Sequence, residues 1–142
     1  MHALSIVLIV LAVLAVVWLA LIRGHTGNPL RQKLDGHLYA HRGYHSDPDA
    51  PENSREAFRR AAARGFGSEL DVHLLKDGRL AVLHDSVLAR MTGREGVVED
   101  LTAGQLGEYT LGKSSETIPT LEDVLAIYDG RAPLIIELTT WH

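Results

Sequence analysis

The hydrophobic positions of the chain divide it into one long apolar run and a longer region of short strand-like and helix-like segments. Residues 3–22 form twenty consecutive positions in which only Ser5 is polar. Twenty residues of α-helix rise about 30 Å, the thickness of a bilayer's hydrocarbon core. We therefore expect residues 1–23 to form a transmembrane helix, with Trp18 at the membrane interface.

A cleaved signal peptide is the alternative interpretation of this run. Only Met1 and His2 precede it, without the lysine or arginine of a signal peptide's first region, and the run is longer than the usual apolar core of such a peptide. These features favour an uncleaved anchor. Because Arg23, Arg31 and Lys33 all follow the run, the positive-inside rule predicts a single-pass membrane protein whose remaining residues lie in the cytoplasm.

The next stretch, residues 24–36, is polar and interrupted by glycine and proline, which predicts a juxtamembrane linker. The folded domain is expected over residues 37–142. Its first short apolar strand ends at His41. Asn53, with Glu56 three residues later, predicts a helix N-cap with its capping partner.

In the second predicted strand, residues 66–75, polar and apolar side chains alternate. Successive side chains of a strand point to opposite faces, so Glu69, Asp71 and His73 share one face. Two neighbouring carboxylates repel each other unless they share a proton or a cation. The strand therefore indicates a charged site, whereas a hydrogen-bonded structural role fits His73 better.

A tight turn is predicted at residues 76–79, and an apolar strand over residues 80–83 leads to His84 and Asp85. The Asp-Gly pair in the turn favours an antiparallel hairpin. A parallel pair of strands would need a crossover of about a dozen residues or more. The sequence leaves the choice between these two arrangements open.

Two more helices and one more strand are predicted in the rest of the chain. Thr102 and Gln105 match a capping box, and residues 119–128 have helical spacing. Residues 133–138 predict a buried strand that carries Glu137 near its end. Strands that alternate with helices, with polar residues at the strands' carboxyl ends, are typical of an α/β fold, either a β/α barrel or a doubly wound sheet.

The composition narrows the chemistry of the site. The chain has 142 residues and a formal net charge of -4, without a basic stripe, which gives no support for a nucleic-acid partner. It contains no cysteine, so a metal must be held by oxygen or imidazole. Carboxylates favour a hard cation, Mg²⁺ or Ca²⁺, over zinc. The candidate carboxylates are Glu69, Asp71 and Glu137.

A series of short motifs resembles, in order and spacing, the glycerophosphodiester phosphodiesterases, a family related in fold to the phosphatidylinositol-specific phospholipases C. The motifs are His41-Arg42-Gly43, Pro51-Glu52-Asn53-Ser54, Glu69-Leu70-Asp71-Val72, Lys76-Asp77-Gly78, His84-Asp85, Met91-Thr92-Gly93, Ile118-Pro119-Thr120-Leu121-Glu122-Asp123-Val124-Leu125 and Ile136-Glu137-Leu138.

The resemblance implies a TIM-type (β/α) barrel that uses a divalent cation, Ca²⁺ or Mg²⁺, to cleave glycerophosphodiesters to an alcohol and glycerol 3-phosphate. By position, His41 and His84 correspond to the general acid and base. Arg42 corresponds to a phosphate clamp in catalysis and substrate binding, and Asn53 to a supporting polar residue of the substrate site. The implied metal ligands are Glu69, Asp71 and Glu137.

This chemistry agrees with the residue types themselves. A phosphodiester is an anion that resists attack, so a cation and a guanidinium are needed to neutralise the charge that develops on its oxygens. One imidazole takes a proton from the attacking hydroxyl and the other gives one to the departing alkoxide. The ordinary imidazole pKa of about 6.5 suits both tasks.

The sequence departs from the family pattern in three places. Leu75 and Ser54 stand where the family usually has threonine, and the lysine that usually follows Ile136-Glu137-Leu138 is replaced by Thr139. A closed barrel needs eight strands and about 250 residues. We therefore expect only the N-terminal half of a barrel, with about four strands, as an early stop or a frameshifted tail would leave.

Three functions are compatible with this sequence. The first is a membrane-anchored, metal-dependent phosphodiesterase, active alone or after half-barrels self-associate through their open strand edges. The second is a catalytically inactive truncated fragment, held in the membrane through residues 3–22. The third is a membrane protein that binds phosphate and a cation without turnover.

Overall fold

The computed structural model describes residues 2–22 and 33–139, which form two separate units divided after Asp35. Most of the linker predicted at residues 24–36 lies outside the described residues. The same is true of Arg23 and Arg31, on which the predicted membrane orientation depends, and of residues 140–142.

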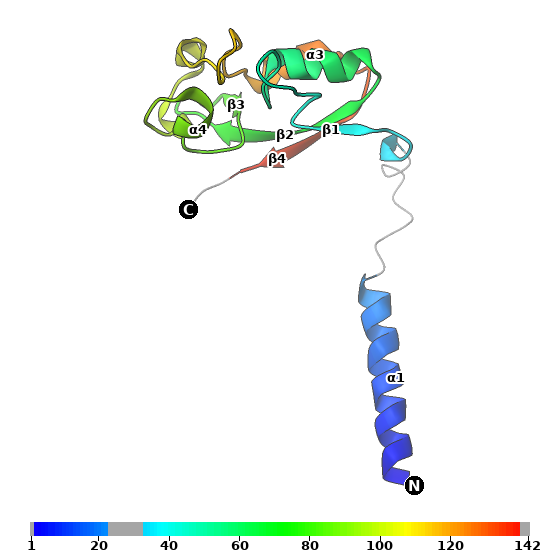
Figure 1. Cartoon of the computed structure of the whole chain (residues 1–142). Helices are drawn as coiled ribbons and strands as arrows, with labels where there is room; N and C mark the ends of the chain where they lie inside the picture. The colour runs from blue at the N-terminus through cyan, green and yellow to red at the C-terminus, as the bar shows by residue number, and fades with distance from the viewer. Residues whose placement is uncertain (1, 23–32, 140–142) are drawn as a thin grey trace. The chain divides into compact units, whose positions relative to one another are not determined.

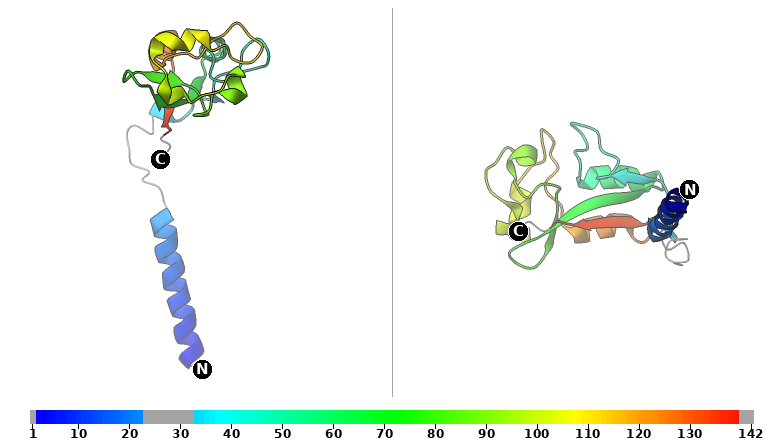
Figure 2. Two further views of the ribbon diagram at one scale, coloured as in Figure 1. Left: turned by 90° about the vertical axis from the view of Figure 1, so that its left-hand side faces the viewer. Right: turned by 90° about the horizontal axis from the view of Figure 1, so that it is seen from below.

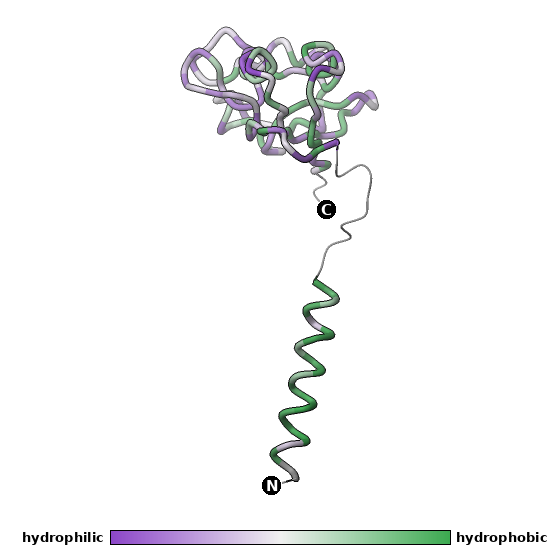
Figure 3. The backbone as a smooth tube through the Cα atoms, turned by 90° about the vertical axis from the view of Figure 1, so that its right-hand side faces the viewer, coloured by the Kyte–Doolittle hydropathy of each residue, from purple (hydrophilic) through white to green (hydrophobic). Residues whose placement is uncertain are grey.

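The first unit contains α1 (His2–Ile22), a single uninterrupted helix whose backbone is coloured as hydrophobic over most of its length in Figure 3. Residues Leu4–Ile22 are long and apolar enough to cross a membrane, and Trp18 is exposed. A signal sequence near an N-terminus can meet the same criteria of length and composition. The helix is therefore confirmed, and the membrane span stays a prediction.

The second unit is built on one mixed sheet in which β2 is the central strand (Figure 1). Ser68 of β2 pairs in parallel with Ala40 on one side and with Leu134 on the other, while Val72 pairs with Val82 in antiparallel orientation. One edge of β2 therefore carries β4, and the other carries β1 followed by β3. In the view from below in Figure 2, β1 (cyan) and β4 (red) lie on opposite sides of β2 (green). The strands are β1 (Tyr39–His41), β2 (Gly67–Leu74), β3 (Leu80–Val82) and β4 (Leu134–Leu138).

The turn between β2 and β3 settles the choice that the sequence leaves open, because the two strands form an antiparallel hairpin. The Leu75 amide donates to the Arg79 carbonyl at 2.8 Å, and Gly78 adopts the positive φ of +81° that the turn requires. Only β1, β2 and β4 have the parallel order of a β/α barrel. Within the described residues the sheet thus has the four strands that the sequence predicts, and β3 is the one that runs antiparallel.

Two helices lie on the same side of this sheet, α3 (Arg55–Ala63) and α5 (Leu121–Tyr128) (Figure 1). Fully burying one large apolar side chain contributes about 1.5–3 kcal/mol, so this layer supplies much of the stability of the sheet. The Ser68 and Tyr128 hydroxyls are 2.6 Å apart within it. The apolar side chains between sheet and helices include Phe58, Leu70, Val72, Val124 and Tyr128.

The predicted N-cap of α3 is wrong by one residue. Ser54 caps the helix, and its hydroxyl accepts from the Ala57 amide at 3.1 Å. Asn53 has a left-handed backbone (φ 56°) and directs its amide group to Asp71 instead. By contrast, the predicted start of α5 is confirmed, because Thr120 and Asp123 form a reciprocal capping box.

Residues 75–118 form a second packed region, called the lobe from here on. It surrounds its own cluster of buried apolar side chains, which includes Leu88, Leu106 and Leu111. The predicted capping box of Thr102 and Gln105 is present and starts a 3₁₀-helix. The helices of the lobe are α4 (Ala89–Thr92), η1 (Val98–Asp100) and η2 (Ala103–Glu108).

The last strand, β4, lies where the sequence predicts it but is not buried. Ile135, Ile136 and Leu138 are 44%, 40% and 72% exposed. Within the described residues β4 pairs only with β2, so its second edge has no neighbouring strand. The apolar pattern of residues 133–138 predicted a buried strand, and this prediction is wrong for the described residues, in which β4 is exposed.

Candidate catalytic and metal-binding site

The strand order brings the two histidine segments to the same part of β2. His41 ends β1 opposite Glu69, and β3 returns along the same edge until the Leu83 amide donates to the Asp71 carbonyl at 3.1 Å. Because β1 and β3 approach this edge from opposite directions, the chain leaves the sheet at His41 and before His84. The parallel pairing of β1 places the His41 segment beside Glu69, and the antiparallel hairpin places the His84 segment beside Asp71.

Three carboxylates converge on one face of the sheet. Asp71 and Glu137 are direct partners in the parallel register, and Glu69 stands two residues before Asp71 on the same face. Their oxygens lie within 4.8 Å of one another. Asp71 is only 3% exposed, whereas Glu137 on the outer strand is exposed.

Arg42 and Asn53 bind the two carboxylates of β2. The Arg42 Nε lies 3.5 Å from Asp71 Oδ2, and its backbone amide donates to Glu69 Oε2 at 3.2 Å. The Asn53 Nδ2 donates to the same Asp71 oxygen at 3.2 Å. The His41 Nε2 lies 3.7 Å from Glu69 Oε2. The structure therefore brings five of the predicted residues into direct contact around these carboxylates.

This arrangement fits a divalent cation. Of the three carboxylates, Asp71 lies against the Arg42 guanidinium, and the candidate ligand atoms of the group are oxygens, which suit Mg²⁺ or Ca²⁺. Buried Asn53 Oδ1 has no hydrogen-bond partner within the described residues. A buried acceptor without a donor costs free energy, so an unsatisfied oxygen beside the acidic group is consistent with a positively charged ligand there.

The loop between β1 and α3 holds Arg42 and Asn53 in an uncommon backbone conformation. Both residues have a φ of 56°, and the Asn53 amide donates to the Arg42 carbonyl at 2.9 Å. At Gly43, φ is +81°, and an added Cβ would lie 2.8 Å from the Cβ of Ala57 in α3. Strained backbone of this kind persists where the surrounding structure fixes it, often at functional sites.

The His84 ring is bound to Asp85 rather than to the carboxylates. Its Nδ1 lies 2.7 Å from Asp85 Oδ1, and 42% of the side chain is exposed. A hydrogen bond from Arg90 lowers the pKa of Asp85, although burial opposes this effect, so the carboxylate is ionised and accepts the Nδ1 proton. The ring then presents Nε2 for proton transfer.

His73 has the structural role that its position predicts. The ring is fully buried, with Nδ1 at 2.7 Å from Glu99 Oε1 and Nε2 at 3.2 Å from the His84 carbonyl oxygen. It therefore supports the segment that carries His84. His73 lies on the same face of β2 as Glu69 and Asp71, but its ring is bonded to Glu99 and His84 of the lobe.

Sequence reasoning assigned no role to Glu52 or Arg90. The Glu52 Oε1 accepts from Arg42 Nη1 at 3.2 Å and from Arg90 Nη2 at 2.6 Å. Glu52 lies inside a recognised motif, which is a signal that could have identified it. Arg90 has no such local signal, because only the folded chain brings it to Glu52.

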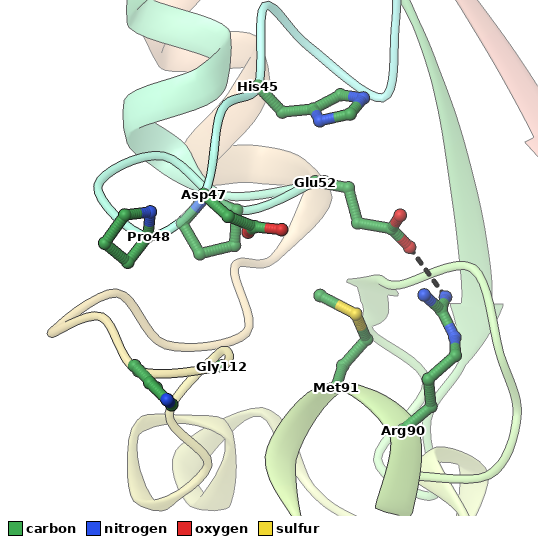
Figure 4. A pocket seen from close by; sticks show the side chains of 9 residues that line it. His45, Asp47, Pro48, Glu52, Arg90, Met91 and Gly112 are labelled. Carbon is green, nitrogen blue, oxygen red and sulfur yellow. Dashed lines mark hydrogen bonds and ion pairs between the residues drawn. The ribbon is translucent and has the colours of Figure 1, made fainter.

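A cavity of about 450 Å³ opens beside this pair, between the β1–α3 loop and the lobe. In Figure 4, Glu52 and Arg90 face each other at one side of it, and Asp47 and His45 extend from the loop. Proline rings and Met91 supply its apolar surface. Its lining includes Glu52, which binds Arg42, but not Arg42 itself or the carboxylates of β2 and β4.

Comparison with known proteins identifies relatives of this region. Residues 41–140 match the model of the glycerophosphoryl diester phosphodiesterase family. A glycerophosphodiester phosphodiesterase of Bacillus altitudinis is 41% identical over 108 residues, which are 71% of this chain and 43% of that protein. The chain thus spans less than half the length of this relative.

Solved structures share the same fold. A phosphodiesterase of Oleispira antarctica, in complex with the product sn-glycerol-3-phosphate, matches with a TM-score of 0.64 and 30% identity, over 72% of this chain and 44% of that one. A glycerophosphodiester phosphodiesterase of Thermotoga maritima matches with a TM-score of 0.63 and 35% identity, over 73% and 44% of the two chains. These relatives are TIM barrels, and the described sheet corresponds to part of such a barrel.

Proposed function

The chain belongs to the glycerophosphoryl diester phosphodiesterase family, and from this premise we propose that its site hydrolyses a glycerophosphodiester to an alcohol and glycerol 3-phosphate. One observation carries the proposal: the oxygens of Glu69, Asp71 and Glu137 lie within 4.8 Å of one another, beside the Arg42 guanidinium. A relative of known structure holds the product sn-glycerol-3-phosphate. The shared fold makes the same class of substrate the best candidate here.

In this proposal the three carboxylates hold a divalent cation, Ca²⁺ or Mg²⁺, in keeping with the general use of such cations in this family. The bound cation supplies positive charge that stabilises the negative charge developing on the phosphoryl oxygens. Asp71 is the central ligand because it is buried and already oriented by Asn53.

Arg42 binds the phosphate of the substrate. Its Nη1 is held by Glu52, while its Nε is buried without a hydrogen-bond partner within the described residues. Charge-assisted hydrogen bonds from a guanidinium to phosphate oxygens are short and strong. Because Nε faces Asp71 Oδ2 at 3.5 Å, a phosphate would be bound by the other N–H groups of this guanidinium, with Asn53 as a supporting polar residue.

His41 and His84 transfer the protons. One ring accepts a proton from the attacking hydroxyl as the new P–O bond forms, and the other donates a proton to the alkoxide as the old P–O bond breaks. Asp85 keeps the Nδ1 proton of His84 in place, so that its Nε2 is the reacting atom. His41 is 69% exposed at the end of β1 and is free to approach a substrate.

We further propose that residues 1–23 anchor the chain in a membrane as a single span, that residues 24–36 are a linker and that residues 37–142 form the partial phosphodiesterase domain on the cytoplasmic side. The length and apolar surface of α1 support the anchor. The exposed side chains of β4 support self-association of two sheets through this edge.

A second candidate function is binding of phosphate and a cation without turnover. The exposure of Glu137 favours it, because a ligand on a solvent-exposed outer strand is held less rigidly than Asp71. Catalysis requires the reacting groups to be held more tightly than binding does.

The test uses the full chain in detergent micelles with glycerophosphocholine and either Ca²⁺ or Mg²⁺. We expect His41→Ala and His84→Ala each to lower turnover by about 10²–10⁴-fold, because each removes a proton-transfer group, while cation binding persists. The exposed His37 lies outside the site, so His37→Ala serves as the matched control.

Unchanged release of glycerol 3-phosphate in either variant would refute the assigned roles. Cation binding by a wild-type chain that releases no product would support the second candidate function instead.

A further inference from the structure

Arg90 connects two acidic residues that come from different parts of the fold. It lies in α4 of the lobe, and its Nη2 donates to Glu52 Oε1 at 2.6 Å, the contact drawn in Figure 4. Its Nε donates to Asp85 Oδ2. Glu52 belongs to the loop after β1, whereas Asp85 follows β3. One guanidinium therefore joins the two chain segments that border the site.

Each of these acids also holds a residue of the proposed reaction. The second contact of Glu52 is with Arg42, at 3.2 Å, and the second contact of Asp85 is with the His84 ring, at 2.7 Å. The groups form an uninterrupted row of hydrogen-bonded side chains in which Arg90 is the middle member. The row runs through Arg42, Glu52, Arg90, Asp85 and His84.

Arg90 stands between the two acids of this row, and its positive charge favours the ionised form of Glu52 and of Asp85. The hydrogen bonds that Arg90 donates to Glu52 and to Asp85 raise the pKa of Arg90 above its usual value. Burial works to raise the pKa of Glu52, but hydrogen bonds and charge from Arg90 and Arg42 outweigh it, so the pKa is lowered. Both acids are therefore acceptors for the groups on either side of them.

The planar guanidinium of Arg90 fixes the directions of its hydrogen bonds to Glu52 and Asp85. Two nitrogens of one rigid fork bind two carboxylates, which a lysine ammonium cannot reproduce in the same geometry. With Oδ2 of Asp85 occupied by Arg90, Oδ1 is left to accept the Nδ1 proton of His84. Glu52 accepts hydrogen bonds from both Arg42 and Arg90. Its single negative charge therefore does not fully neutralise the positive charge of Arg42.

We propose that Arg90 is a positioning residue for the phosphodiester reaction: it fixes the Nδ1-protonated form of His84 through Asp85 and the place of the Arg42 guanidinium through Glu52. The inference rests on the proposed function for its kinetic consequence. Its structural consequence, the tautomer of His84, does not depend on turnover.

The same contacts contribute little to the stability of the lobe. The Arg90 side chain is 47% exposed, and ion pairs at such positions contribute little to the free energy of unfolding. The apolar cluster of the lobe is formed by other side chains. Substitution of Arg90 is therefore expected to change the site without unfolding the protein, so an altered site can be separated from a misfolded one.

The experiment compares Arg90→Gln, Arg90→Lys and the matched control Arg94→Gln in the full chain. Arg94 lies in the same lobe and covers the Tyr109 ring outside the row. Long-range ¹H–¹⁵N spectra of the histidine rings are recorded at a pH at which the His84 ring is neutral, with His84→Ala used to assign its signal.

Wild type and Arg94→Gln are expected to show the Nδ1-protonated ring, and Arg90→Gln a mixture of both tautomers, with Arg90→Lys in between. In the phosphodiesterase assay Arg90→Gln should lower kcat by about 10-fold with KM within about 2-fold, as for other residues that orient reacting groups through a hydrogen bond.

An unchanged His84 tautomer in Arg90→Gln would overturn the proposal, whether or not the chain turns over. A large rise in KM with unchanged kcat would overturn it as well, because Arg90 would then bind substrate directly. Absence of activity in wild type would refute the proposed function, while the ring spectra would still decide the role of Arg90.

Discussion

The lobe and the parallel sheet layer differ in how completely they enclose their apolar side chains. In the lobe, Leu88 and Leu111 are at most 1% exposed, and the whole cluster comes from residues 75–118. In the sheet layer, Ile136 and Leu138 of β4 remain 40% and 72% exposed. One continuous segment of the chain therefore completes the core of the lobe. In the sheet layer, no other described element fully covers the apolar side chains of Ile136 and Leu138 in β4.

The candidate site lies where these two regions meet. The sheet layer contributes Glu69, Asp71 and Arg42, and the lobe contributes His84 with its supporting residues. The positions of the reacting groups thus depend on contacts between the regions as much as on either core. Glu52 and Arg90 provide one such contact.

The largest expected effect is on the free energy of unfolding, and it compares a substitution in the core of the lobe with one on the exposed strand β4. Leu111→Ala removes a fully buried side chain from the lobe and should lower the free energy of unfolding by about 2–5 kcal/mol. Ile136→Ala on the exposed strand should cost about 1 kcal/mol or less. Urea denaturation of the full chain in micelles measures both, and equal losses would contradict the difference between the regions.

A second, smaller effect concerns the loop on the sheet side of the site. Gly43→Ala places a Cβ at a φ of +81°, which costs about 1–2 kcal/mol, and adds a contact of 2.8 Å with Ala57. Gly65→Ala is the matched control, because its φ of +70° carries the same backbone cost with no atom within 4 Å. We expect the Gly43 variant to be the less stable of the two in thermal denaturation. Equal midpoints would show that α3 does not constrain the loop.

The smallest effect is on the pH dependence of stability at the contact between the regions. Asp85 has a lowered pKa in the folded protein, chiefly because of Arg90, so it contributes stability above its ordinary value of 3.8 and loses it as pH falls through the folded value. In Arg90→Gln the free energy of unfolding should fall less steeply below about pH 4, by under about 1 kcal/mol in total. The measurement is a series of urea titrations at decreasing pH. An unchanged slope would mean that Arg90 does not hold Asp85 in solution.

Features encoded by neighbouring residues could be predicted from the sequence. The alternation that places Glu69 and Asp71 on one face of β2, the end of β1 at His41 and the capping box at Thr102 all depend on local geometry, and the structure contains them. The family was recognisable because its motifs are short and follow a fixed order.

Features that depend on distant partners were missed. The sequence predicts Asn53 as the N-cap of α3. In the structure its side chain donates a hydrogen bond to the Asp71 carboxylate, and Ser54 is the N-cap. The apolar residues of β4 predicted a buried strand. The sequence pattern alone does not show whether a neighbouring strand covers them, and the structure leaves them exposed. Arg90 could not be identified, since Glu52 lies 38 residues away in the chain.

The central claim is that carboxylates of β2 and β4 form one cation site beside the proposed reacting groups. Isothermal titration of the full chain with Ca²⁺ and with Mg²⁺ tests it most directly, using Asp71→Asn and, as a control, Glu108→Gln at an exposed position of the lobe. We expect wild type and the control to bind one cation per chain, and Asp71→Asn to bind at least about 10-fold more weakly. Equal affinity in all three proteins would contradict the account.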